Sequence, residues 1–347
     1  MKPISFTVVV PAYNAAAFLE RAVRSVTEQR YPQCRVVIVN DGSADATGDV
    51  AAALAAENPR VYAIEQENSG QLLSRTNGIR YAQTHFADEN NYFLFLDADD
   101  VFLPGSLARI AMLLTEHDCD LLFFEVEQMD EATGKTRPFG GSFYGEPASK
   151  AALYQTVLYD YRYNSLCRKA VSAKLTADRD FSPYGHLRNA EDLVQSLDYY
   201  RAARHVYFSD ECFYRYYMNS ASVTHSLTLA KYPLDSTARR LTWELLREEQ
   251  VWTQAETDAY AAFLLKLLKK KIEAICSFDA SSAEKAAAYE TLRQDGFYRQ
   301  LLTMAKRRDR VLTLFEQGKF AAMERAVRVS RVAGAVRRRL QPDKKNR

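Results

Sequence analysis

Closely spaced acidic residues follow an apolar run in the first hundred residues, where Asp97-Ala98-Asp99 comes directly after residues 92–96. Two carboxylates separated by one residue can hold a hard divalent cation, Mn²⁺ or Mg²⁺, together with the phosphate oxygens of a ligand. Such a triplet is weak alone, since a random chain of this length contains on the order of one. Asp118-Cys119-Asp120 and Asp178-Arg179-Asp180 follow no strong strand pattern, so we expect them in solvated turns. Asp97 and Asp99 are therefore the predicted metal ligands.

Four β-branched runs precede polar segments in this part of the chain, and helical patterns separate them. We expect strands at residues 6–10, 35–39, 61–65 and 92–96. The alternation predicts an α/β fold, with a Rossmann-like, mostly parallel sheet flanked by helices. Ligands bind at the carboxyl ends of such strands, so the polar segments that follow them are expected together at one edge. They are Pro-Ala-Tyr-Asn (11–14), Asn-Asp-Gly-Ser (40–43), Glu-Asn-Ser-Gly (67–70) and Asp-Ala-Asp-Asp (97–100).

Capping residues and changes of pattern place the remaining elements. Asn14 is expected to cap the helix after the first strand, and Ser43 or Asp45 the helix after the second. A helix at 104–115, a strand at 121–126 and a loop or hairpin at 127–150 follow. From about residue 234 the pattern is helical, with an amphipathic helix at 259–275. We therefore predict one domain at residues 1–230 and a helical C-terminal extension at residues 231–347.

The segment Asn40-Asp41-Gly42 has two interpretations. Asn-Gly and Asp-Gly are strong hairpin signals. A helical pattern follows this segment, which argues against a hairpin. Asp41 is therefore expected to accept hydrogen bonds from the base or ribose of a nucleotide, and a structural turn-and-cap role is the alternative.

Three segments, in this order and spacing, look like glycosyltransferase family 2 with the GT-A fold. They are Val-Val-Val-Pro-Ala-Tyr-Asn (8–14), Val-Asn-Asp-Gly-Ser (39–43) and Phe-Leu-Asp-Ala-Asp-Asp (95–100). The resemblance covers residues 1–230 and makes them the catalytic domain. It implies that the nucleotide, usually uridine, is bound by Pro11, Ala12, Tyr13 and Asp41. It also implies that Asp97 contacts ribose or metal, and that Asp99 binds the metal.

Two further segments extend the resemblance. The family carries a segment like Ala-Arg-Asn-x-Gly, and residues 74–78 match it at Arg75 and Gly78, while Thr76 replaces the usual Asn. Arg75 is accordingly assigned to nucleotide binding. The family also has an acidic pair that faces the acceptor, and Asn-Ala-Glu-Asp-Leu at 189–193 resembles it, with Glu191 in the donor and acceptor region. Asp192 becomes the candidate catalytic base.

The chemistry requires such a base, because an acceptor hydroxyl must lose its proton as it attacks the anomeric carbon. A carboxylate on the face opposite the diphosphate would give inverted stereochemistry. The alternative for Glu191 and Asp192 is a structural one, since acidic pairs at helix starts favour the macrodipole.

An aromatic segment and a loop later in the chain match the family more loosely. Tyr-Arg-Tyr-Tyr at 214–217 has Tyr217 where the family usually has Arg. Ser222 and His225 resemble a loop over the diphosphate, and His225 is a third metal ligand or a phosphate donor, or else an ordinary surface histidine. Three tyrosines, Tyr161, Tyr163 and Tyr184, could stack on acceptor sugars, but in a chain with 21 tyrosines packing is the expected role.

Composition limits the partners and the compartment. The 46 Lys and Arg nearly balance 44 Asp and Glu, so net charge gives no reason to expect nucleic acid. Five scattered cysteines without a Cys-x-x-Cys pair fit a reduced, cytoplasmic compartment. No window has the roughly 18 apolar residues of a membrane-spanning helix. The basic tail at 325–347 either lies on an anionic membrane surface, at the inner face of the cell membrane, or is solvated.

Together these features predict an inverting glycosyltransferase that depends on Mn²⁺ or Mg²⁺. The resemblance indicates hexosyl or N-acetylhexosaminyl transfer from a UDP-sugar to a hydroxyl of a glycan or lipid-linked glycan, in bacterial surface polysaccharide synthesis. A non-catalytic nucleotide-sugar-binding or scaffolding subunit is one alternative. A nucleotidyltransferase is another, but it would carry a Gly-rich basic loop where this chain has Ala15-Ala16-Ala17.

Overall fold

The computed structural model describes most of the chain. The described residues are 3–86, 88, 90–176, 179–187, 190–218, 228–232, 234–305 and 309–340, with the backbone alone for 231 and 332–340. The chain divides into two compact units, residues 1–222 and 223–347. The domain boundary that the sequence suggests, after residue 230, lies close to this division and stays a prediction.

The first unit begins with strands and helices that alternate, as the sequence predicts. In chain order they are β1 (Ser5–Ala12), α1 (Leu19–Thr27), β2 (Cys34–Asp41), α2 (Thr47–Glu57), β3 (Val61–Gln66), α3 (Gln71–His85), β4 (Asn91–Phe95), β5 (Val101–Phe102) and α4 (Ser106–Glu116). Within the described residues the strands form one nine-stranded sheet in the order β3-β2-β1-β4-β8-β6-β9-β5, with β7 paired to β6. β3, β2, β1 and β4 run parallel, which confirms the predicted α/β fold and its four strands.

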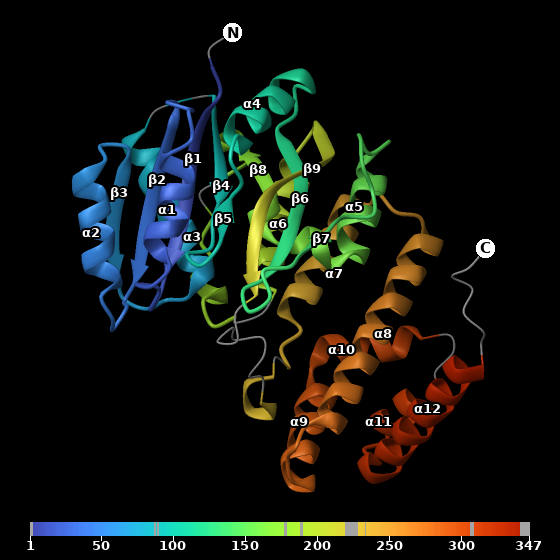
Figure 1. Cartoon of the computed structure of the whole chain (residues 1–347). Helices are drawn as coiled ribbons and strands as arrows, with labels where there is room; N and C mark the ends of the chain where they lie inside the picture. The colour runs from blue at the N-terminus through green and yellow to red at the C-terminus, as the bar shows by residue number, and fades with distance from the viewer. Residues whose placement is uncertain are drawn as a thin grey trace. The chain divides into compact units, whose positions relative to one another are not determined.

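Helices cover both faces of this parallel part (Figure 1). α1 and α2 pack on the face that carries Val8 and Ile38, in the hydrophobic core. α3 lies on the other face, where a Cβ at Gly78 would be 2.5 Å from Val9 Cγ1 and 3.1 Å from Val39 Cγ2. Glycine at position 78 therefore allows α3 to approach β1 and β2 closely.

The second part of the sheet is mixed. Its elements, with η for a 3₁₀ helix, are β6 (Leu121–Asp130), β7 (Thr136–Phe139), α5 (Lys150–Tyr159), η1 (Tyr161–Asn164), η2 (Leu166–Arg168), β8 (Lys169–Ser172), η3 (Ala173–Leu175), η4 (Ser182–Tyr184), α6 (Glu191–Ala202) and β9 (Val206–Met218). β8 is antiparallel to both β4 and β6, so it joins the two parts, and β6 is parallel to β9. The hairpin predicted within 127–150 is the pairing of β6 with β7.

The second unit is helical in its described residues. Its elements are η6 (Leu229–Lys231), α7 (Thr237–Glu249), α8 (Gln254–Ser277), α9 (Ser282–Gln294), α10 (Gly296–Met304), α11 (Arg310–Glu316) and α12 (Phe320–Leu340). α8 and α9 begin with capping boxes at Thr253 and Ser281. α8 buries Leu264, Leu268 and Ile272 and contacts α9, α10 and α12, which confirms the predicted amphipathic helix. Among the helices described, none combines the length and apolar character needed to cross a bilayer.

One of the predicted helix caps in the first unit is confirmed: Asp45 Oδ1 accepts a hydrogen bond from the amide of Thr47, the first residue of α2, at 3.0 Å. The other two, Asn14 and Ser43, are wrong. α1 begins at Leu19, after Phe18, and α2 begins at Thr47, after Ala46, and neither preceding residue makes a side-chain capping bond. Asn14 instead adopts a φ of 50° and its Oδ1 accepts a hydrogen bond from the amide of Ala44 at 2.9 Å. The polar residues of these loops bond across to the neighbouring loop, so they connect two strand ends.

Candidate active site

The loops that follow β1 and β2 meet at the carboxyl edge of the parallel strands. The amide of Asn14 donates to Ser43 Oγ at 3.0 Å, which ties the two loops together. Pro11 and Ala12 are buried at the end of β1, whereas Tyr13 is 54% exposed. Within this predicted nucleotide-binding segment, the Tyr13 side chain is thus the one open to a ligand.

Asp41, at the end of β2, is buried and organises the loop before α3. Its Oδ1 accepts hydrogen bonds from the amide of Ser69 at 2.8 Å and from Gln66 Nε2 at 2.7 Å. Its Oδ2 accepts one from the amide of Gly70 at 2.9 Å. Both oxygens hold the backbone and side chains of this loop, and the nucleotide-binding role of Asp41 stays a prediction.

Arg75 of α3 joins two acids that lie far apart in the sequence. It is 1% exposed, and one terminal nitrogen donates to Asp97 Oδ1 at 2.9 Å while the other donates to Asp192 Oδ1. Gln71, one turn earlier, also donates to Asp97 Oδ1 at 2.8 Å. Burial lowers the pKa of Arg75, but the charges of Asp192 and Asp97 outweigh it and raise that pKa. The sequence assigned Arg75 to the nucleotide and did not predict that it links these two acids.

Asp100 is a structural residue that the sequence did not single out. It is fully buried, and its Oδ2 accepts a hydrogen bond from the Tyr214 hydroxyl at 2.8 Å, while its Oδ1 accepts one from the amide of Tyr217 at 2.8 Å. The Tyr214 hydroxyl also accepts one from the amide of Asp97 at 3.1 Å. The aromatic strand β9 therefore positions the acidic turn, a contact that the sequence analysis of residues 214–217 did not predict.

Asp97 and Asp99 keep oxygens that a cation can use. Arg75 and Gln71 occupy Oδ1 of Asp97, whereas Oδ2 accepts no hydrogen bond within the described residues. The Asp99 carboxylate accepts none from another described residue, and its carbonyl accepts one from Arg21 at 2.7 Å. Burial, followed by the charge of Asp97, raises the pKa of Asp99. A divalent cation beside this carboxylate would favour its charged form and so counteract both effects. These carboxylates therefore fit one side of a metal site.

Further ligands would have to complete that site. In the part of the chain that the structure describes, no group of three His, Cys, Asp or Glu side chains could hold a metal. Hard cations commonly take phosphate oxygens and water beside one or two carboxylates. Ser222 and His225 lie outside the described residues, so their predicted roles in metal or diphosphate binding stay predictions.

The acidic pair begins α6, after Ala190 with a φ of 64°. Asp192 is 22% exposed, and besides Arg75 it is held by the amide of Leu166, which donates to its Oδ2 at 3.2 Å. Glu191 Oε2 is buried without a partner among the described residues. Burial, followed by the charge of Asp192, raises the pKa of Glu191. The two acids thus have different surroundings, and Asp192 is the one fixed by neighbouring donors.

Known proteins resemble this chain in sequence and in fold. Residues 7–176 match the model described as glycosyl transferase family 2. Glycosyltransferase GlyA of Streptococcus pneumoniae is 24% identical over 226 residues, which are 64% of this chain and 32% of GlyA. Glycosyltransferase GlyG of the same organism is 25% identical over 222 residues, which are 62% of this chain and 72% of GlyG. The chain therefore spans about a third of the first relative and most of the second.

A solved structure extends the likeness to the whole fold. The crystal structure of Staphylococcus aureus TarS residues 1–349 in complex with UDP-GlcNAc matches with a TM-score of 0.69 at 18% identity, over 95% of this chain and 92% of that chain. This confirms the predicted GT-A fold, and the relatives confirm the enzyme class predicted from the motifs. By its motifs, its sheet and its relatives, the chain belongs to glycosyltransferase family 2.

Proposed function

We propose that this chain is an inverting glycosyltransferase that moves a hexosyl or N-acetylhexosaminyl group from a UDP-sugar to a hydroxyl of a glycan or lipid-linked glycan. The observation that carries the proposal is the convergence of Asp97, Asp99 and Asp192 at one edge of the sheet, with Arg75 between two of them. These residues supply a cation-binding side and a proton acceptor within one site. Bacterial surface polysaccharide synthesis is the proposed setting.

The donor binds at the carboxyl edge of β1 and β2 in this proposal. Tyr13 is exposed there and can stack on the base, while Pro11 and Ala12 shape the backbone below it. Asp41 fixes the loop at residues 67–70 and so the edge that the ribose would contact. The structural neighbour TarS was crystallised with UDP-GlcNAc, which supports a UDP-sugar as the donor.

Asp99 and the free Oδ2 of Asp97 would hold Mn²⁺ or Mg²⁺. When bound, such a cation acts as a Lewis acid that offsets the negative charge on the departing diphosphate. Arg75 keeps Asp97 in place through its other oxygen, so the orientation of the carboxylate does not depend on the cation.

Asp192 is the proposed base. Its carboxylate takes the proton of the acceptor hydroxyl as the oxygen forms a bond to the anomeric carbon and the bond from that carbon to the diphosphate breaks. Arg75 and the amide of Leu166 fix the carboxylate, so its proton-accepting oxygens are oriented before the acceptor arrives. Attack from the side opposite the diphosphate inverts the stereochemistry at that carbon.

We further propose that the chain works at the cytoplasmic face of the cell membrane. Arg325, Arg328 and Arg331 on α12 begin the basic tail of residues 325–347. Each basic residue near an anionic leaflet contributes about 1 kcal/mol to binding. A lipid-linked acceptor would lie at the same surface.

Thermal unfolding with UDP, GDP, CDP and dTDP, each with Mn²⁺ or with a chelator, tests the donor site. A nucleotide at 100 times its Kd stabilises the folded state by about 2.7 kcal/mol. We expect the largest shift with UDP and Mn²⁺, and the loss of this shift with chelator or in Asp99→Asn. That variant should also lose sugar transfer. An unchanged UDP shift and normal turnover in Asp99→Asn would contradict the site, and no shift in the folded wild type would favour the scaffolding alternative.

A further inference from the structure

A cleft of about 950 Å³ lies in the first unit between the end of β7, α5 and η1. Phe139, Phe143, Tyr159 and Tyr161 contribute aromatic rings to its lining. Tyr161 is 69% exposed, and its ring centre lies 6.3 Å from that of Phe139 at an angle of 59°. Of the tyrosines considered in the sequence, Tyr163 is buried in packing as expected, whereas Tyr161 is open. Several aromatic rings around one hollow indicate a ligand site better than scattered exposed rings do.

The polar residues of the cleft compensate each other in charge. Arg162 Nη2 lies 2.6 Å from Asp160 Oδ2, and Arg162 Nε also donates to that carboxylate. Ser142 Oγ donates to Asp160 Oδ2 at 3.0 Å. Among the residues that line the cleft, Arg162 is the sole cation, and it is already paired. The lining therefore offers hydrogen-bonding groups and aromatic faces without net charge.

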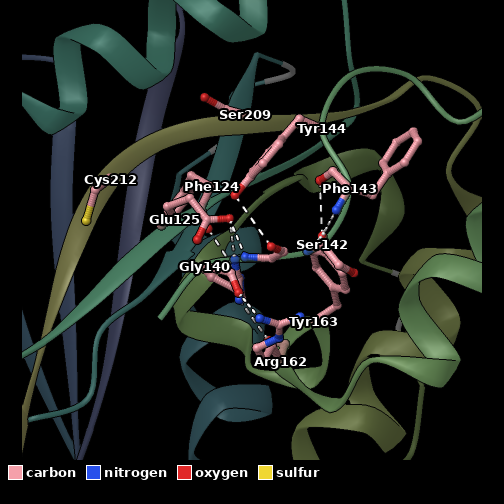
Figure 2. A network of polar contacts seen from close by, with 12 residues as sticks. Phe124, Glu125, Gly140, Ser142, Phe143, Tyr144, Arg162, Tyr163, Ser209 and Cys212 are labelled. Atoms are coloured by element: carbon pink, nitrogen blue, oxygen red, sulfur yellow. Dashed lines mark hydrogen bonds and ion pairs between the residues drawn. The ribbon is translucent and has the colours of Figure 1, made fainter. Parts of the chain in front are cut away.

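Part-buried polar contacts fix one wall of the cleft (Figure 2). The Tyr163 hydroxyl accepts hydrogen bonds from the amides of Ser142 and Phe143, both at 2.9 Å, and Arg162 donates to the carbonyl of Gly140. The amide of Gly141 donates to Glu125 Oε1 at 2.7 Å, and a Cβ at Gly141 would overlap the Tyr163 hydroxyl. A wall fixed in this way loses little conformational entropy when a ligand binds.

The same chain segment leads from the cleft to the proposed base. Tyr161 lines the cleft at the start of η1, and the amide of Leu166 at the start of η2 donates to Asp192 Oδ2. The Tyr200 hydroxyl of α6 donates to the carbonyl of Tyr163 at 2.8 Å, so η1 is attached to the helix that carries Asp192. A molecule bound in the cleft would therefore lie beside the segment that holds the base.

We propose that this aromatic cleft binds a neutral oligosaccharide segment of the acceptor, a few sugars away from the hydroxyl that reacts. The apolar faces of the sugar rings stack on Tyr161 and Phe139, and their hydroxyls bond to Asp160 and Arg162. The proposal rests on the proposed function, because an acceptor is needed only by a chain that transfers a sugar. A strongly anionic polymer fits worse, since its charges would have to compete with Asp160 for Arg162.

An array of immobilised neutral and anionic tetrasaccharides, probed with the full chain, tests the ligand class. Titration calorimetry with the best neutral tetrasaccharide then compares the wild type with Tyr161→Ala, Tyr161→Phe and Tyr144→Ala. Tyr161→Ala should bind roughly tenfold more weakly, because it loses an aromatic contact, and Tyr161→Phe should bind as the wild type does. Tyr144, which is 48% exposed and lies outside the cleft lining, is the matched control; its hydroxyl donates to the carbonyl of Gly141 at 3.5 Å, so its truncation should weaken binding far less than that of Tyr161.

Four results would overturn the proposal: no binding by the folded wild type, binding of anionic tetrasaccharides alone, equal binding by Tyr161→Ala, or an equal loss in Tyr144→Ala. The UDP thermal shift in the same proteins separates this proposal from the proposed function. A UDP shift with no glycan binding would remove the cleft as an acceptor site and leave the donor site standing. Glycan binding that depends on Tyr161, with no UDP shift, would support the cleft and count against sugar transfer.

Discussion

The two halves of the first unit position their polar side chains by different means. In the donor half, residues 5–102, contacts join neighbouring loops: Asn14 bonds to Ser43 and Asp41 to Ser69, and each pair is fewer than 30 residues apart. In the acceptor half, residues 121–218, the proposed base Asp192 depends on Arg75, 117 residues earlier in the chain. The predicted nucleotide-binding loops of the donor half are thus organised by consecutive strands, whereas the proposed base needs a partner from the other half, and so does the acidic turn at 97–100, which β9 holds.

Arg75 joins the two halves through their acids, because it bonds both to Asp97 and to Asp192. The donor half can hold Asp97 with Gln71 as well as with Arg75, whereas the Oδ1 of Asp192 is held by Arg75. Changes confined to one half should therefore affect donor binding or transfer separately, and a change at Arg75 should affect both. Three predictions follow this contrast, from the largest expected effect to the smallest.

Arg75→Met should have the largest effect, because it removes the positive charge between Asp97 and Asp192. Loss of one member of a buried ion pair costs about 3–5 kcal/mol, so the midpoint of urea unfolding should fall strongly. Nucleotide binding and sugar transfer should both be lost. Arg75→Lys keeps the charge but not the forked geometry, and should recover stability in part without recovering transfer. Wild-type stability in Arg75→Met would show that the two halves are not coupled through this residue.

Asp192→Asn should affect the acceptor half alone. The loss of a general base slows a reaction about 10²–10⁴-fold, so the rate of transfer should fall within this range. The thermal shift with UDP and Mn²⁺ should remain that of the wild type, because Asp97 keeps Arg75 and Gln71. The rate of transfer and the thermal shift with UDP and Mn²⁺, measured on the same preparation, check these two expectations. If both fell together, Asp192 would belong to the donor site and the base would have to be another residue.

Two glycines provide a matched pair with the smallest expected effect. A methyl group at Gly78 would press on Val9 in the donor half, and one at Gly141 would press on Tyr163 in the acceptor half. Each Gly→Ala variant should lose about 1–3 kcal/mol of unfolding free energy from overpacking. Gly78→Ala should also weaken UDP binding, since α3 carries Arg75, whereas Gly141→Ala should weaken glycan binding and spare UDP. The opposite pattern in the two titrations would contradict the division into halves.

The strands of the donor half, and the edge at which their polar residues meet, could be predicted from the sequence. The four strands appear within two residues of their predicted ends, because buried parallel strands give continuous β-branched runs. Their order along the chain also placed Asp41, Asp97 and the residues at 11–13 at one edge. Of the helix caps, Asp45 was predicted and Asn14 was not a cap, since the sequence cannot show whether a polar residue caps its own helix or bonds to the next loop.

The acceptor half could be predicted only as isolated elements and motifs. The family motif identified Asp192, but no local pattern shows that Leu166 and Arg75 hold it. These contacts follow from β8 lying between β4 and β6, and periodicity does not encode strand order. The structural role of Asp100 was not predicted either, because its burial and its hydrogen bond with Tyr214 depend on β9, which comes more than 100 residues later in the chain. The structure brings the predicted acids together, and their chemical roles stay proposals.

The position of β8 in the sheet has a consequence for synthesis on the ribosome. β1 to β4 are complete once residue 95 has been made, but the open edge of β4 can pair only after residues 169–172 of β8 have been made. Arg75 can pair with Asp192 only later still. At 5–20 residues per second, the chain from residue 95 to the end of β8 takes on the order of ten seconds to make. During that interval the nascent chain exposes an unpaired strand edge of the kind that aggregates. Binding of a chaperone to the nascent chain would matter most in these seconds.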